Sequence, residues 1–207
     1  MTLALVLAGG GERAVAWERG VLAGLALPEP DLVVGTSAGS YVASSMFAAP
    51  VDFSAAVEAW VSAAPEERRR AVGVVALGVE ETWPAALRLV VIEARSGERV
   101  VFGPYMDGAV GTATNADVAS GAERVVIVTP NPAEATGNAL FSIWQEALEE
   151  EIEALERAGS EVLLVQAGPD DQAAMGLEFM SGDRSREAFA AGQSRGRLLQ
   201  YTVRCRR

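Results

Sequence analysis

The stretch that decides the fold is Leu3 to Gly11, which reads Leu-Ala-Leu-Val-Leu-Ala-Gly-Gly-Gly. Its apolar part, Leu3 to Ala8, has the length of a buried β-strand, and the three glycines predict a tight loop. Residues 13–27 then carry apolar side chains at helical spacing. A strand, a glycine loop and a helix, in this order, open a doubly wound α/β fold.

A second strand-to-helix unit follows. Asp31 to Gly35 predicts another buried strand, and residues 38–49 predict a helix rich in small residues. Between them lies Ser37, in the motif Gly-Thr-Ser-Ala-Gly whose glycines, Gly35 and Gly39, relieve crowding at the turn. A serine placed there sits at a helix N-terminus, where the helix dipole stabilises developing negative charge. This context favours a nucleophile, although the motif alone also fits a helix N-cap beside a tight turn.

The choice of a base for Ser37 is narrowed by what the chain lacks. It has no histidine, and all 17 of its basic residues are arginines. A Ser-His-acid triad and a Ser-Lys dyad are therefore excluded. The base would have to be a carboxylate, the N-terminal amine or water. Asp107, in Tyr-Met-Asp-Gly-Ala, is a candidate, but an Asp-Gly pair is also an ordinary turn. Other carboxylates remain open on sequence grounds.

The glycine loop is the second candidate element of a site. Gly9, Gly10 and Gly11 leave backbone N–H groups that could form an anion cradle or an oxyanion hole. A tight βα turn is the alternative that needs no ligand. The spacing is neither that of a dinucleotide fingerprint nor that of a P-loop, so it gives only weak support for a nucleotide-binding domain.

The rest of the chain continues to alternate strands and helices. Helices are predicted at residues 54–64, 141–158 and 184–199, with a short helical turn at 115–119. Strands are predicted at residues 87–93, 99–102, 124–129 and 161–166, the first two forming a β-hairpin. We therefore expect one domain, residues 1–207, with a three-layer α/β/α fold and a mostly parallel central sheet. Ligands of such sheets bind at the carboxyl ends of the strands, where both glycine motifs and Asp107 are expected.

Composition excludes several classes of function. The net charge of −11 argues against a nucleic-acid partner, which would require a basic face. Cys205 is the only cysteine, so no intrachain disulfide can form and a Cys/His metal site is excluded. The N-terminus has no basic region typical of a signal peptide, and no apolar run is long enough to span a membrane. We expect a cytoplasmic protein of undefined oligomeric state.

Taken together and in order, these motifs resemble those of the patatin-like phospholipases, acyl hydrolases with a Ser-Asp dyad. The resemblance rests on Gly9-Gly10-Gly11-Glu12-Arg13, Arg19-Gly20-Val21-Leu22, Gly35-Thr36-Ser37-Ala38-Gly39-Ser40, Asp107-Gly108-Ala109 and residues 112–117. For such a family the absence of histidine is expected.

The resemblance implies a role for each matched residue. Ser37 would be the nucleophile and Asp107 its base, with Gly108 following it in the motif. The amides of Gly9, Gly10 and Gly11 would form the oxyanion hole, and Arg13 would support that loop. Gly35 and Gly39 would shape the turn. The implied substrate is a fatty-acyl or phospholipid ester, reached through transient contact with a membrane surface, and no metal or cofactor is implied.

The chain departs from the family pattern in length. Only 70 residues separate Ser37 from Asp107, and the region after Trp60 is abbreviated. A helix and a proline-rich segment that help to wall the acyl pocket in the family are missing before Asp107, and Ala14 replaces a frequent glycine. The alternative to an esterase is therefore a shortened scaffold or acyl-binding module that keeps the motifs as turns.

Overall fold

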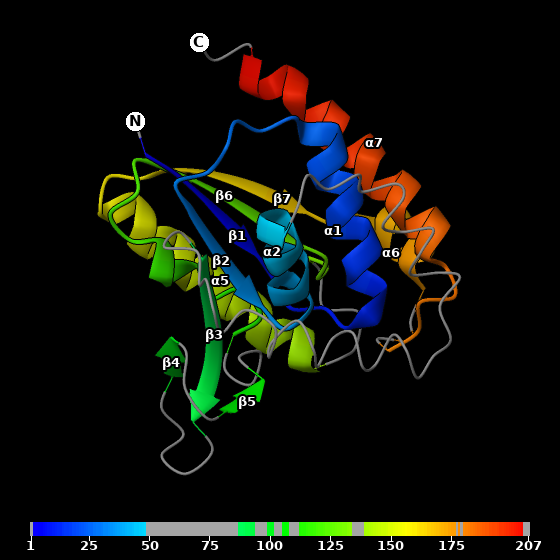
Figure 1. The fold of residues 1–207 in the computed structure, drawn as a ribbon, viewed down its shortest axis with the longest axis horizontal. Coiled ribbons are helices and arrows are strands. Elements are labelled where there is room, and N and C mark those ends of the chain that lie inside the picture. Colours follow the sequence, from blue (N-terminus) through cyan, green and yellow to red (C-terminus); the bar gives the residue numbers. More distant parts are fainter. Residues whose placement is uncertain are drawn as a thin grey trace.

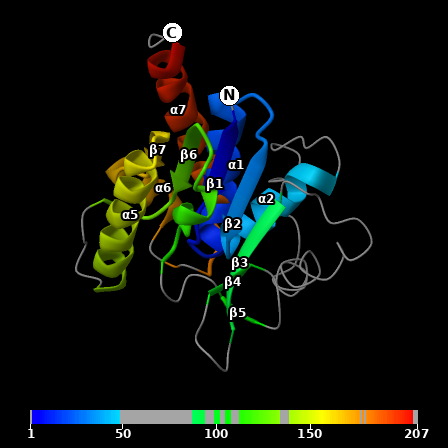
Figure 2. The same ribbon diagram turned by 90° about the vertical axis from the view of Figure 1, so that its left-hand side faces the viewer.

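The computed structural model describes residues 2–48, 87–93, 99–101, 105–107, 112–133, 139–176, 178 and 180–204. Within them, seven strands form one sheet in the order β4-β3-β2-β1-β6-β7, with β5 paired to β3 outside this path. The strands that run parallel are β1 (Leu3–Leu7), β2 (Leu32–Thr36), β3 (Leu87–Glu93), β6 (Arg124–Thr129) and β7 (Glu161–Gln166). Two short strands, β4 (Arg99–Val101) and β5 (Tyr105–Asp107), pair antiparallel with β3 and gather at one end of it (Figure 2).

Successive side chains of β1 face two separate cores, because side chains alternate across a sheet. Leu3, Leu5 and Leu7 pack against the helices of one face. These helices are α1 (Glu12–Leu25), α2 (Ala38–Ala48), α6 (Pro169–Met175) and α7 (Ser185–Arg204). Ala4 and Val6 pack on the other face with α5 (Ala139–Arg157) and the 3-10 turn η2 (Ala116–Ala119). Helices therefore cover both faces of a largely parallel sheet (Figure 1), which confirms the predicted fold class.

Most predicted elements agree with the structure to within a few residues. The strands predicted at residues 124–129 and 161–166 have exactly those bounds, and the hairpin strands β3 and β4 pair as expected. The helix predicted to stop at Gly159 ends at Arg157, with Gly159 at φ 96°. The C-terminal helix continues to Arg204, five residues beyond the prediction. The helix predicted at residues 54–64 lies outside the described residues.

Two elements, α6 and β5, were not predicted from the sequence because both are short. Helix α6 has seven residues, too few to show a periodicity. Its start does carry a local signal, since Pro169 occupies the first turn and the Asp171 carboxylate accepts the Gly168 N–H at 2.8 Å. Strand β5 has three residues and is defined only by its pairing with β3.

Helices α1 and α7 lie side by side (Figure 1) because glycines allow their backbones to approach closely. Gly20 and Gly24 of α1 face backbone atoms of α7, and Gly192 and Gly196 of α7 face backbone atoms of α1. At each of the four positions, a Cβ atom would run into a backbone oxygen of the opposite helix. The two glycine pairs, each spaced by four residues, are thus a steric requirement of this interface.

Replacing Gly192 by alanine tests this interface. The new Cβ would collide with the Trp17 carbonyl oxygen. We expect the free energy of unfolding to fall by about 1–3 kcal/mol, although alanine favours an isolated helix over glycine by about 1 kcal/mol. Ala190→Leu, on the exposed side of α7, is the matched control and should leave stability nearly unchanged. A Gly192→Ala variant more stable than the parent in urea titrations would contradict the close packing.

Helix α1 also buries charge. Arg13, Glu18 and Arg19 are each at most 3% exposed. The Arg19 guanidinium lies 5.0 Å from the centre of the Tyr41 ring, a cation–π contact between α1 and α2. The two Glu18 carboxyl oxygens accept no hydrogen bond from any residue that the structure describes. Burial raises the pKa of Glu18 well above its ordinary value, and the nearby Arg19 charge opposes this only in part.

The pH dependence of stability should reveal Glu18. Because the fold favours its protonated form, the stability that this form contributes is present at low pH and lost as pH rises through the raised pKa. In Glu18→Gln, a neutral isostere, that loss should disappear, so the variant should gain stability relative to the parent as pH rises above about 4.5. Thermal unfolding from pH 4 to 8 measures this. Glu150→Gln, at an exposed site on α5, should follow the parent throughout; identical curves for all three proteins would rule the explanation out.

Candidate active site

Ser37 occupies a sharp turn between β2 and α2. Its φ of 50° lies in the left-handed region, which a non-glycine residue seldom adopts. The strand ends at Thr36 and the helix begins at Ala38, so the serine stands alone between them, half-buried, at the N-terminus of α2. Backbone strain of this kind is concentrated at functional sites. The local geometry is the strand–serine–helix turn expected from the sequence.

Gly35 and Gly39 are required by how closely this turn packs. A Cβ on Gly35 would lie 2.7 Å from the Ser40 Cα, inside the turn itself. A Cβ on Gly39 would run into the carbonyl oxygen of Leu7, at the end of β1. The Gly39 amide donates a hydrogen bond of 3.2 Å to the Ala8 carbonyl. Close packing and this hydrogen bond therefore hold the turn against the end of β1, next to the glycine loop.

The glycine loop uses one of its three amides internally. The Gly9 N–H donates to the Ala113 carbonyl at 2.7 Å, and the Gly9 carbonyl accepts from Asn131 Nδ2 at 2.9 Å. This corrects the prediction that all three amides face a ligand, because the Gly9 amide is already engaged. The amides of Gly10 and Gly11 donate to no residue in the described part of the chain. Gly11 has a φ of 73°, a conformation that favours glycine.

The register of the sheet brings the backbone of Asp107 next to Ser37. Strand β4 pairs with Val90 and Val91 of β3 and so occupies one edge of that strand. On the opposite edge Val90 pairs with Thr36 of β2, and Val91 pairs with Asp107 of β5. Adjacent positions along a strand are about 3.3 Å apart. The end of β5 therefore meets the end of β2. Along this edge of β3, Asp107 lies one position beyond Thr36, the residue that precedes Ser37.

A buried hydrogen-bond network next to the Ser37 turn was not predicted from the sequence. Thr36 Oγ1 donates to the Thr114 carbonyl at 3.2 Å and accepts from Asn115 Nδ2 at 3.1 Å. Thr114 Oγ1 in turn donates to Glu151 Oε2 on α5 at 2.6 Å. Thr36, Thr114, Asn115 and Glu151 are all buried. The network connects the residue before Ser37 with the segment that follows Asp107.

The sequence did hold a signal for Glu151. The buried apolar side chains of α5 are Phe141, Trp144, Leu148 and Leu155. Glu151 occupies the missing position of that stripe, where helical spacing calls for an apolar residue. It was overlooked because it is the last residue of Glu149-Glu150-Glu151, which as a run of charges is typical of a solvated face.

Of the two remaining predicted residues, Arg13 is described by the structure and Gly108 is not. Arg13 is buried at the start of α1, where its Nη1 donates to the Gly176 carbonyl at 2.6 Å and its guanidinium lies 6.0 Å from the Phe141 ring centre. It thus connects the turn after the glycine loop to the end of α6. Gly108 lies outside the described residues.

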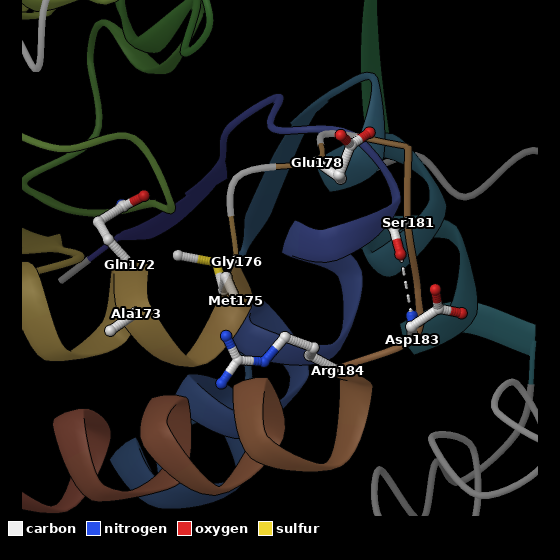
Figure 3. A pocket seen from close by; sticks show the side chains of 8 residues that line it. All are labelled: Gln172, Ala173, Met175, Gly176, Glu178, Ser181, Asp183 and Arg184. Carbon is white, nitrogen blue, oxygen red and sulfur yellow. Dashed lines mark hydrogen bonds between the residues drawn. The ribbon is translucent and has the colours of Figure 1, made fainter.

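A surface hollow of about 790 Å³ lies beside α6 and the segment that leads from it toward α7 (Figure 3). Its lining residues are Gln172, Ala173, Met175, Gly176, Glu178, Ser181, Asp183 and Arg184. None of them is a predicted site residue, although Arg13 reaches the hollow's edge through its bond to Gly176.

The described residues hold no group of three or more acidic or cysteine side chains placed to bind a metal ion. Among them, no helix combines the length and the apolar character needed to cross a membrane.

The comparison with known families agrees with the resemblance seen in the motifs. The model of the patatin-like phospholipase family matches residues 5–87. This segment contains the glycine loop, Arg13 and the turn around Ser37, and it ends before Asp107. No curated protein matches the chain. The resemblance to a family of lipid acyl hydrolases is confirmed for residues 5–87, in a chain of 207 residues.

Asn131 offers a test of how the glycine loop is held. Asn131→Asp keeps the shape of the side chain but replaces the Nδ2 donor by an oxygen that faces the Gly9 carbonyl. We expect the free energy of unfolding to fall by about 1–3 kcal/mol and the Gly9 amide to exchange faster with deuterium. Ser120→Asp, which adds the same charge at an exposed position, should change neither quantity. Unchanged exchange at Gly9 in Asn131→Asp would show that this bond does not hold the loop.

Proposed function

We propose that this chain hydrolyses carboxylic esters of fatty acids, with Ser37 as nucleophile and Asp107 as its base. The observation that carries the proposal is the meeting of two strand ends on one edge of β3, which sets the Asp107 backbone beside a strained Ser37. The match of residues 5–87 to lipid acyl hydrolases supports the same chemistry. A carboxylate is also one of the three kinds of base that remain open to a chain without histidine or lysine.

In the first half-reaction, Ser37 Oγ attacks the ester carbonyl carbon while Asp107 accepts the hydroxyl proton. The negative charge that develops on the carbonyl oxygen is stabilised by backbone amides. The free amides of Gly10 and Gly11 are candidates, and so is the amide of Ala38, which as the first residue of α2 donates to no described residue. The tetrahedral intermediate collapses to an acyl-enzyme, and Asp107 returns the proton to the leaving alcohol.

In the second half-reaction, Asp107 takes a proton from water, and the resulting hydroxide attacks the acyl-enzyme. The fatty acid leaves and Ser37 Oγ regains its proton. The helix dipole of α2 favours both tetrahedral intermediates because it directs its positive end toward the developing oxyanion. Neither half-reaction requires a metal or a cofactor. The substrate would be a fatty-acyl or phospholipid ester.

The proposal is tested by labelling with a fluorophosphonate, which reacts with activated serines. Intact mass after incubation should show one adduct on the parent and none on Ser37→Ala. Ser45→Ala is the matched control, because Ser45 lies on the same helix and, among the described residues, its hydroxyl donates to the Val42 carbonyl within that helix. Asp107→Asn should slow the hydrolysis of a p-nitrophenyl ester by at least about 100-fold, as expected for loss of a general base.

Two results would refute this assignment. A well-folded parent that takes up no fluorophosphonate would favour the alternative of a shortened scaffold that keeps the motifs only as turns. Full activity of Asp107→Asn would leave Ser37 as a nucleophile but would require a different base. Matched circular dichroism spectra of all variants separate these results from unfolding.

A further inference from the structure

Glu151 is a buried carboxylate whose position in the fold needs explanation. It lies on α5, on the face of the sheet opposite α2, and only 8% of it is exposed. Its Oε2 accepts two hydrogen bonds, from Thr114 Oγ1 at 2.6 Å and from the Ala116 N–H at 2.9 Å. Both donors belong to the segment that follows Asp107 along the chain.

Burying a carboxylate at this position disfavours folding. Burial raises the pKa of Glu151, and the nearby Asp117 raises it further, although hydrogen bonds from Thr114, Ala116 and Thr112 oppose the shift. A leucine would continue the apolar stripe of α5 at no such cost. Positions where a sequence departs from the expected pattern of buried apolar residues, at a cost in stability, are concentrated at functional sites.

The segment that Glu151 holds contacts the glycine loop and the serine turn at the same time. The Ala113 carbonyl accepts the Gly9 amide at 2.7 Å. Asn115, itself at φ 52°, donates through Nδ2 to Thr36 Oγ1 at 3.1 Å and to the Thr112 carbonyl at 3.1 Å.

The same segment is connected to Asp107 through the chain itself, since Thr112 follows Asp107 by five residues. Residues 112–116 therefore bind the strand end before Ser37 and the first peptide of the glycine loop, and they follow the proposed base. Glu151 is bonded to the middle of this segment.

We propose that Glu151 is a positioning residue, which through Thr114 and Ala116 fixes segment 112–116 and thereby the relative placement of Ser37, Asp107 and the glycine loop. The inference rests on the proposed function, because it assigns Glu151 a part in the same reaction. It touches neither substrate nor reacting atoms. Its effect should fall on the rate of the chemical step, since a misplacement of about 1 Å can lower a rate about 100-fold.

The test compares Glu151→Gln with Glu150→Gln, its exposed neighbour, in steady-state hydrolysis of a p-nitrophenyl ester. We expect kcat of Glu151→Gln to fall about 10- to 100-fold while KM stays within about twofold, and Glu150→Gln to match the parent. Thr114→Val should reproduce the loss, and Thr114→Ser, which keeps the hydroxyl donor, should restore most of the rate. Urea unfolding of each variant measures global stability.

Three results would overturn the proposal. One is parental kcat in Glu151→Gln. Another is a rate loss in Thr114→Ser as large as in Thr114→Val. The third is a loss of rate that simply follows the loss of unfolding free energy across the variants, which would indicate a purely structural role.

A second readout separates this proposal from the proposed function. Deuterium exchange at the Gly9 and Gly39 amides, which donate to the Ala113 and Ala8 carbonyls, reports how firmly the loop and the turn are held, whether or not the parent hydrolyses esters. Faster exchange in Glu151→Gln at unchanged global stability supports the positioning role even for an inactive parent, in which case only the proposed function fails. Unchanged exchange in an inactive parent and its variant refutes the positioning role.

Discussion

The structure around Ser37 depends on how closely other backbone segments can approach the carboxyl end of β1. Three segments contact this end of β1: the start of α2, strand β6 and the segment after Asp107. They reach Leu7, Ala8 and Gly9. The Ala8 carbonyl accepts the Gly39 amide, the Ala8 amide donates to Val128, and the Gly9 amide donates to Ala113. The first of these contacts is possible because Gly39 has no Cβ to collide with Leu7. A single side-chain atom at this position would separate the serine turn from the glycine loop.

The same constraint of close approach recurs on the outer layer of the molecule. Helix α7 lies against α1 through glycines on both helices, and α1 begins directly after the glycine loop. Arg13, at this beginning, bonds to the end of α6. The C-terminal third of the chain therefore supports the N-terminal motifs, although the family match ends at residue 87. On the opposite face, Glu151 supports them through hydrogen bonds to residues 114 and 116.

Much of the fold was predictable because its periodic signals are local. Continuous apolar runs identified β1, β6 and β7, and helical spacing identified α1, α5 and α7, since each depends only on which side chains must be buried. Elements of seven residues or fewer without such a signal, α6 and β5, were missed. The serine turn was predicted because its glycines and serine are adjacent in sequence. The engaged Gly9 amide was not, because its acceptor lies 104 residues away, at Ala113.

The sequence by itself determined the class of fold, the turn that presents Ser37 and the absence of any histidine or lysine base. These are matters of composition, spacing and local backbone preference. Only the tertiary structure decided which strand ends meet, because β2 and β5 share an edge of β3 through a register that no local pattern specifies. It also decided which glycine amides stay free and that Glu151 faces inward. The physical reason is that hydrogen bonds between distant segments form only once the layers have packed, and a buried donor or acceptor must then find its partner in whatever lies beside it.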